Sequence, residues 1–236
     1  MSDFNPEHFW DTCESGSALI DMNEPWADAQ VGSRRVSLLV IAHARIVWPE
    51  IVAADANDVN INYPGGRARH YIDRCEHALN VCERFLEGQA TAAEREEALA
   101  EIDHIGWMNH GPFLSLDLSL AGYFAESAWR GDLQACYHDA WNPRPERRDR
   151  VCAELLREVF GNPHRPVRFD PAWRTDTAVA IARQMYDSRE FSAMPILADA
   201  LQDAGCDSDE LLNHCRSATA THVRGCWVVD LVLGKG

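Results

Sequence analysis

The chain has 236 residues, of which 46% are hydrophobic and 25% charged, and these ordinary globular values exclude a disordered chain. Its net charge is −15, from 37 acidic against 22 basic residues. Such a chain repels phosphate backbones, so we expect no nucleic-acid binding.

The N-terminus carries no basic stretch followed by an apolar core, which argues against a signal peptide. No segment approaches the roughly 18 consecutive apolar residues of a membrane span. We therefore expect a cytoplasmic protein that does not enter a membrane. In that compartment its eight cysteines should be thiols rather than disulfides.

The N-terminal part of the chain is predicted to be helical. Asn5 before Pro6 is typical of a helix start, because asparagine caps free N–H groups and proline fits the first helical position. Apolar residues then recur at helical spacing over residues 34–48, and Pro49 marks a weakening of that helix. Residues 55–66, rich in asparagine and glycine, are predicted to form a loop.

The next segments also show helical periodicity. Thr91 and Glu94 stand at capping-box spacing, which predicts a helix start there. We predict helices over 67–87 and 91–108, and a buried helical segment over 113–129.

The clearest break in the chain lies at residues 142–145, which contain two prolines. Beyond it, helices are predicted over 147–160, 176–188, 195–204, 208–215 and 226–233, although the last is ambiguous with a strand. We predict an all-α, irregular multi-helix bundle of about eight to ten helices. Its expected domains are an N-terminal helical bundle (1–142) and a C-terminal helical subdomain (143–236) packed against it.

The C-terminal subdomain should have its own apolar core. Large apolar side chains recur on the inward faces of its predicted helices. The residues expected in or near this core are Trp173, Met194, Leu197, Leu201, Leu212, Trp227 and Leu231.

From residue 155 onward the chain carries a specific series of short motifs. They include MPILADAL at 194–201, AGC at 204–206, HCR at 214–216, HVRGCWVVD at 222–230 and LGK at 233–235. In these motifs the last third of the chain resembles an uncharacterised protein family of planctomycete bacteria. The resemblance implies a bacterial lineage and a helical fold, and it implies no activity.

Cysteine and histidine are concentrated near the C-terminus, where they suggest a metal site for zinc or iron. A closed tetrahedral zinc site needs four ligands of this kind, but no Cys-x-x-Cys pair is present. The neighbours His214 and Cys215 point about 100° apart on a helix, so at most one of them should bind the metal. The candidate ligands are Cys206, His214, Cys215, His222 and Cys226.

A packing role is the main alternative for the same residues. Cysteines often pack as small hydrophobic side chains, and the histidines could bond carbonyl groups or Asp230. A third hypothesis is a nucleophilic thiol at Cys226, with His222 four residues before it and Asp230 four residues after it. Catalytic triads normally combine separate elements, so this local spacing is weak support.

Two further regions carry polar groups at suggestive spacing. One face of the helix over 67–87 could join other histidines in a bundle-type metal site, although an exposed polar face explains it equally. A pocket near Trp107 and His110 would suit a small-ligand sensor. The residues concerned in the first hypothesis are His70, Asp73, Arg74 and His77, with His43 or the Glu101–His104 pair.

The chain contains no phosphate-binding glycine loop, dinucleotide fingerprint or nucleophile elbow. We therefore expect a non-catalytic helical interaction or regulatory module with a protein partner. The alternative is a metal-binding (zinc or iron) or thiol-dependent protein that uses the C-terminal cluster.

Overall fold

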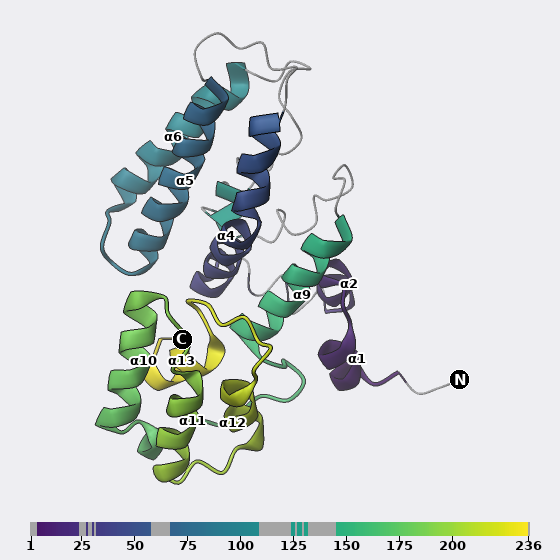
Figure 1. Cartoon of the computed structure of the whole chain (residues 1–236), viewed down its shortest axis with the longest axis vertical. Coiled ribbons are helices and arrows are strands. Elements are labelled where there is room, and N and C mark those ends of the chain that lie inside the picture. The colour runs from purple at the N-terminus through teal and green to yellow at the C-terminus, as the bar shows by residue number, and fades with distance from the viewer. Residues whose placement is uncertain are drawn as a thin grey trace. The chain divides into compact units, whose positions relative to one another are not determined.

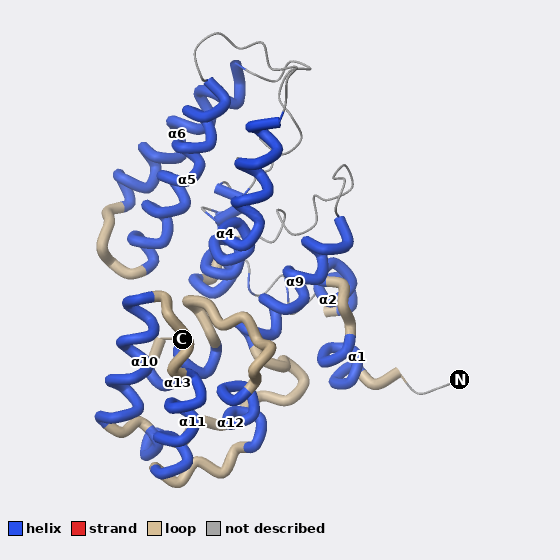
Figure 2. Tube along the Cα trace, viewed as in Figure 1, coloured by secondary structure: helices blue, strands red, loops and turns tan. Residues whose placement is uncertain are grey.

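A computed structural model of the chain describes residues 4–23, 27, 30, 32–57, 67–108, 124–125, 127–128, 130–131 and 145–235. Over these residues the secondary structure consists of ten α-helices and one short 3-10 helix. Figure 2 shows helices and connecting loops throughout the described part, with no strand. The predicted all-α fold is therefore confirmed.

The described residues divide into two compact units. Unit 1 comprises residues 1–14 and 154–236, and unit 2 comprises residues 15–153. The predicted boundary, between residues 142 and 143, falls outside the described residues. The two units divide between residues 153 and 154, eleven residues later. Periodicity did not predict that the first residues join the C-terminal ones, because a side chain distant in sequence makes that link. The Arg157 guanidinium donates hydrogen bonds to the carbonyl oxygens of Trp10, at 2.7 Å, and Cys13.

Unit 2 is built around long helices. The α5 helix lies between α4 and α6 and contacts both (Figure 1). The predicted capping box opens α6, because the Thr91 hydroxyl accepts from the Glu94 N–H at 3.2 Å and the Glu94 carboxylate accepts from the Thr91 N–H at 2.7 Å. The helices of this unit are α2 (Gly16–Met22), α4 (Arg34–Asn57), α5 (Arg67–Leu86), α6 (Ala92–Met108) and the first part of α9 (Pro145–Phe160).

The α4 helix differs from its prediction at Pro49. It continues to Asn57, and we attribute this to the fully buried side chains of Val47 and Ile51 on either side of the proline. Residues Arg34–Ala53 are long and apolar enough to cross a membrane by length and composition. However, 61% of the apolar window is buried inside the protein, as in the core helix of a soluble protein.

Unit 1 contains α1 (Pro6–Thr12), the end of α9, the 3-10 helix η2 (Pro171–Trp173), α10 (Asp176–Ser188), α11 (Met194–Asp203), α12 (Asp209–Arg216) and α13 (Trp227–Leu233). The α11 helix packs between α10 and α12, and α13 contacts both α10 and α12 (Figure 1). The ambiguity between helix and strand in the last segment is resolved as a helix. The Asn5 side chain caps α1 as predicted, accepting from the His8 N–H at 3.1 Å.

The core of unit 1 contains the side chains that the helical pattern placed there. Six of the predicted residues are buried, and Leu231 is partly buried against the same cluster. The buried six are Trp173, Met194, Leu197, Leu201, Leu212 and Trp227.

The α13 helix is fixed at its C-terminal end by two groups. Gly234 ends the helix in the left-handed conformation, at φ 68°, which glycine adopts without steric cost. The Arg174 guanidinium donates to the carbonyl oxygens of Val232, at 3.0 Å, and Leu231, at 2.7 Å. These bonds satisfy carbonyl groups that a helix end leaves free, and they hold the helix whose first turn adjoins Cys226.

Candidate metal centre

Four donor side chains of unit 1 converge from four parts of the chain. Glu158 lies on α9, His214 on α12, His222 in the loop that follows α12, and Cys226 immediately before α13. Each offers one ligand atom, and these four atoms lie within 4.8 Å of one another. Among the described residues, these four form the group of histidine, cysteine and carboxylate side chains that could hold a metal ion.

Several distances inside the group are at hydrogen-bond range. The His222 Nδ1 atom lies 3.1 Å from Glu158 Oε2, and the His214 Nε2 atom lies 3.3 Å from the same oxygen. His214 Nε2 also lies 3.3 Å from Cys226 Sγ. The two imidazole rings face each other edge to face, with centroids 5.1 Å apart. His214 is thus at the centre of the group, in contact with all three other members.

The group is almost closed to solvent. The side chains of Glu158 and His222 are 4% and 7% exposed, and Cys226 is fully buried. His214 is the most accessible member, with 16% of its side chain exposed. The Trp227 ring covers it, with centroids 5.2 Å apart. A bound ion would therefore be largely shielded from water.

A tight turn brings His222 and Cys226 to the same place. The Cys226 N–H donates to the Val223 carbonyl oxygen at 3.0 Å, and Gly225 adopts φ 92° within this turn. Such a positive φ suits glycine, which lacks a Cβ. The Val223 N–H also donates to Glu158 Oε1 at 3.3 Å, so the loop backbone helps to hold the carboxylate, and His222 Nδ1 lies 3.2 Å from the same oxygen.

The electrostatics of the group favour a negative carboxylate. Burial raises the pKa of Glu158, but hydrogen bonds from His214 and His222 and their positive charges outweigh that effect, so the pKa lies below its ordinary value of 4.5. Burial raises the pKa of the Cys226 thiol well above 9.0, and the charge of Glu158 raises it further. Without a metal, Cys226 is therefore a buried, protonated thiol.

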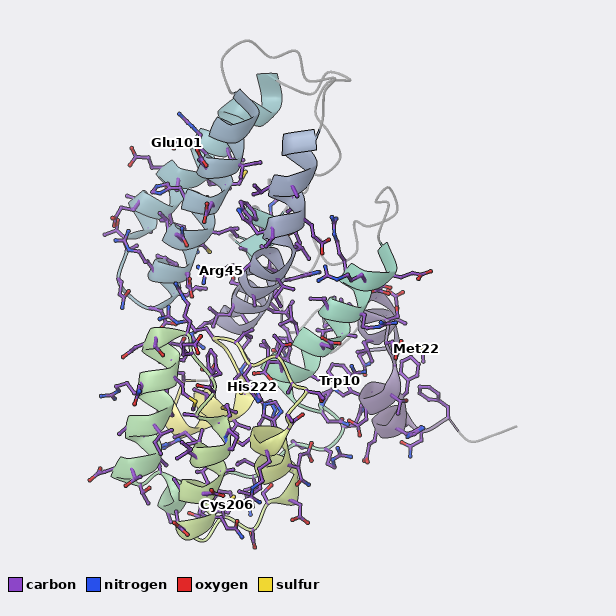
Figure 3. All side chains as sticks on the ribbon, in the orientation of Figure 1. Trp10, Met22, Arg45, Glu101, Cys206 and His222 are labelled. Atoms are coloured by element: carbon purple, nitrogen blue, oxygen red, sulfur yellow. The ribbon has the colours of Figure 1, made fainter. Side chains whose placement is uncertain are left out.

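Three of the five predicted ligands belong to this group, namely His214, His222 and Cys226. The other two, Cys206 and Cys215, are buried in the apolar core of unit 1 and are not part of it. In Figure 3, Cys206 lies at the far end of the C-terminal helices from His222. His214 and Cys215 follow the expected geometry of helical neighbours, since only one of them faces the donor group.

The structure gives less support to the thiol hypothesis. Asp230 is fully buried on α13 and is not among the four converging donors. A reactive cysteine needs a low thiol pKa and access to solvent, whereas Cys226 has a raised pKa and no exposure. His222 contacts the Glu158 carboxylate.

Glu158 is the member that sequence reasoning missed. It lies seven residues after Val151 and three after Leu155, which places it on the apolar face predicted for this helix. A carboxylate on an apolar face is rarely buried unless it is paired, so this position was a usable signal. Its partners lie 56 or more residues away in sequence, and no local pattern points to them.

A cavity of about 1000 Å³ adjoins the group within unit 1. Glu158 and His214 line this cavity, and so do Trp10 of α1 and Trp227 of α13. His222 and Cys226 do not belong to its lining. The group therefore presents two of its four donors to the cavity wall.

The other predicted sites are only partly described. The side chains of His70, His104, Trp107 and His110 lie outside the described residues. Arg74 lies 3.6 Å from the Glu101 carboxylate, which fits an exposed polar face. His43 is buried, and its ring contacts Phe124 at 5.1 Å between centroids.

Comparisons of the chain with protein-family models, curated proteins and solved structures returned no match. The resemblance to a planctomycete family stays a prediction.

Proposed function

We propose that unit 1 is a metal-binding module that holds one zinc ion at Glu158, His214, His222 and Cys226. The observation that carries this proposal is the convergence of one carboxylate, two imidazoles and one thiol within 4.8 Å. Nitrogen, sulfur and carboxylate oxygen are the donors that zinc takes in proteins. Four protein ligands are typical of a structural site, because a catalytic zinc keeps one position open.

The distances support a tetrahedral ion. Zinc ligands at roughly 2.0–2.3 Å from the metal lie roughly 3.3–3.7 Å from one another in a tetrahedron. The contacts of His214 with Glu158 and with Cys226 are both 3.3 Å, and that of His222 with Glu158 is 3.1 Å. These three separations are already close to those of a tetrahedral site, and all four ligand atoms lie within 4.8 Å of one another.

Charge balance also supports a divalent cation. A buried site is most stable when its charges cancel. A Zn²⁺ ion with the Glu158 carboxylate, the Cys226 thiolate and two neutral imidazoles has no net charge. The Glu158 Oε1 atom accepts from the Val223 N–H, and Oε2 is the carboxylate oxygen that contacts both histidines. Such a backbone contact to a ligand is the kind that orients metal-binding carboxylates.

The main competing explanation is a hydrogen-bonded cluster without a metal. In that case Glu158 and a protonated histidine would satisfy each other. It accounts for the contacts of His222 with Glu158 and of Cys226 with His214, and the buried Nε2 atom of His222 has no partner among the described residues on either explanation. A metal adds a reason for a carboxylate, two imidazoles and a thiol to converge on one point.

Metal content of the purified, untagged protein tests the proposal, and the chain offers a matched control. Cys226→Ala removes a ligand, whereas Cys215→Ala removes another buried cysteine that is outside the group. We expect about one zinc per chain in the wild type and in Cys215→Ala, and none in Cys226→Ala. A wild type that neither contains zinc nor binds it in titration would overturn the proposal, as would equal loss in both variants.

The wider role remains the predicted one, a helical interaction module with a protein partner. On this proposal the metal stabilises unit 1 by joining α9, α12, the following loop and α13. The burial and raised pKa of the Cys226 thiol support a structural role for this residue over a nucleophilic one.

A further inference from the structure

Two cavities of unit 1 reach the four-donor group among the described residues. The smaller, of about 420 Å³, is lined by His222, with one arginine and one glutamate as its charged groups. The larger, of about 1000 Å³, is lined by two of the four donors. Glu158 and His214 line it, and His214 is the most exposed of the four donors. Cys226 is fully buried behind them. An ion that reaches the group from this side therefore meets Glu158 and His214 first.

The larger cavity is acidic. Its lining contains five carboxylates, those of Asp11, Glu154, Glu158, Asp209 and Glu210, against two guanidinium groups. Formal charge on the lining is therefore −3 when histidine is neutral. A concave surface lined by one sign of charge concentrates ions of the opposite sign.

Both guanidinium groups are already engaged. Arg165 donates to Glu210 at 2.6 Å and to Asp11 at 3.2 Å, so it offsets one of these two negative charges. Arg157 donates to backbone carbonyl oxygens of α1 and the residue after it. Glu154 and Asp209 are exposed carboxylates of the lining, and they account for two of its three net negative charges.

We infer that this cavity is the path by which the divalent cation enters and leaves, and that its carboxylates speed the entry. The inference rests on the proposed metal site. Through this path the metal can exchange with metal in solution. Once bound, the metal is shielded from water by the buried side chains around it. The acidic lining selects a free or weakly complexed cation as the species that enters, because an anionic metal complex would be repelled.

The rate of zinc uptake by metal-free protein tests this path. Stopped-flow mixing with zinc, followed by a competing fluorescent chelator, gives the rates of uptake and release. The test variant is Glu154→Gln with Asp209→Asn, which removes two charges from the cavity. The matched control is Asp176→Asn with Asp203→Asn, which removes two exposed charges from α10 and α11 outside its lining.

We expect the cavity variant to take up zinc roughly three- to tenfold more slowly at low salt, with an unchanged release rate. High salt should shrink the difference, since exposed charges are then screened. The control variant should match the wild type, and thermal melts should confirm that both variants fold. Equal uptake by the two variants, or a deficit that salt does not change, would overturn the inference. If no protein takes up zinc, the proposed function itself fails.

Discussion

His222 Nδ1 and Glu158 Oε2 lie 3.1 Å apart although 64 residues separate them in the chain. Both side chains are more than nine-tenths buried. A carboxylate so buried needs its partners, because an uncompensated charge away from water is costly. The end of α9 and the loop before α13 therefore stabilise each other through this contact, with or without a metal.

The lowered pKa of Glu158 predicts an acid-sensitive stability in the metal-free protein. Because the folded pKa lies below the ordinary value of 4.5, the carboxylate stabilises the fold fully above that pH. The contribution is lost as pH falls through the lower, folded value. In Glu158→Gln we expect a loss of roughly 3 kcal/mol near neutral pH and a shallower fall of stability below pH 4.5. Urea unfolding with a chelator present, measured from pH 3 to 7, checks this, and parallel curves for the two proteins would contradict it.

The raised pKa of Cys226 predicts that zinc binding releases a proton. The thiol is protonated at neutral pH, whereas zinc binds the thiolate. We expect about one proton to be released by this residue, and the apparent affinity to rise as pH increases. Calorimetric titration in buffers of different ionisation enthalpy counts the protons. Cys215→Ala should release as many as the wild type, and a count near zero would show that Cys226 is not a ligand.

Arg157 is predicted to hold α1 on unit 1. Its guanidinium bonds two carbonyl oxygens at the end of that helix, those of Trp10 and Cys13. We expect Arg157→Ala to lower the free energy of unfolding by about 2 kcal/mol, as is typical for a lost charged hydrogen bond. Hydrogen exchange in residues 6–13 should become faster. Arg183→Ala, at an exposed position of α10, is the control, and equal exchange in the two variants would refute this role.

Arg189 is predicted to be a strained position. It ends α10 in the left-handed conformation, at φ 60°, where a Cβ atom is unfavourable. We expect Arg189→Gly to be more stable than Arg189→Ala by about 1 kcal/mol, because both lose the side chain and only glycine loses the Cβ. Thermal or urea unfolding of the two variants measures the difference. Equal stability would mean that the loop relaxes in the alanine variant.

Helix positions followed closely from the sequence, because caps and apolar spacing act within one or two turns. The predicted helix over 176–188 is observed with those bounds, and the Thr91–Glu94 capping box begins α6 as expected. Pro49 was the exception, since burial of the residues around it outweighed the local preference. The apolar spacing also placed the core residues of unit 1 correctly.

Only part of the candidate site could be predicted from the sequence. Residue type and local density singled out His214, His222 and Cys226, but the same reasoning included Cys206 and Cys215. The choice among them depends on the rotation of α12 and on the turn at Gly225, which determine the direction of each side chain. Local spacing could not supply these directions, because packing of the whole unit sets them.

By itself, the sequence determined the helical class, most helix bounds and the apolar residues of the C-terminal core. These properties depend on interactions between residues close in sequence. Only the tertiary structure decided that α1 belongs with the C-terminal unit and that Glu158 completes the donor group. Both depend on contacts between groups 56 to 147 residues apart, which form only once the chain has folded.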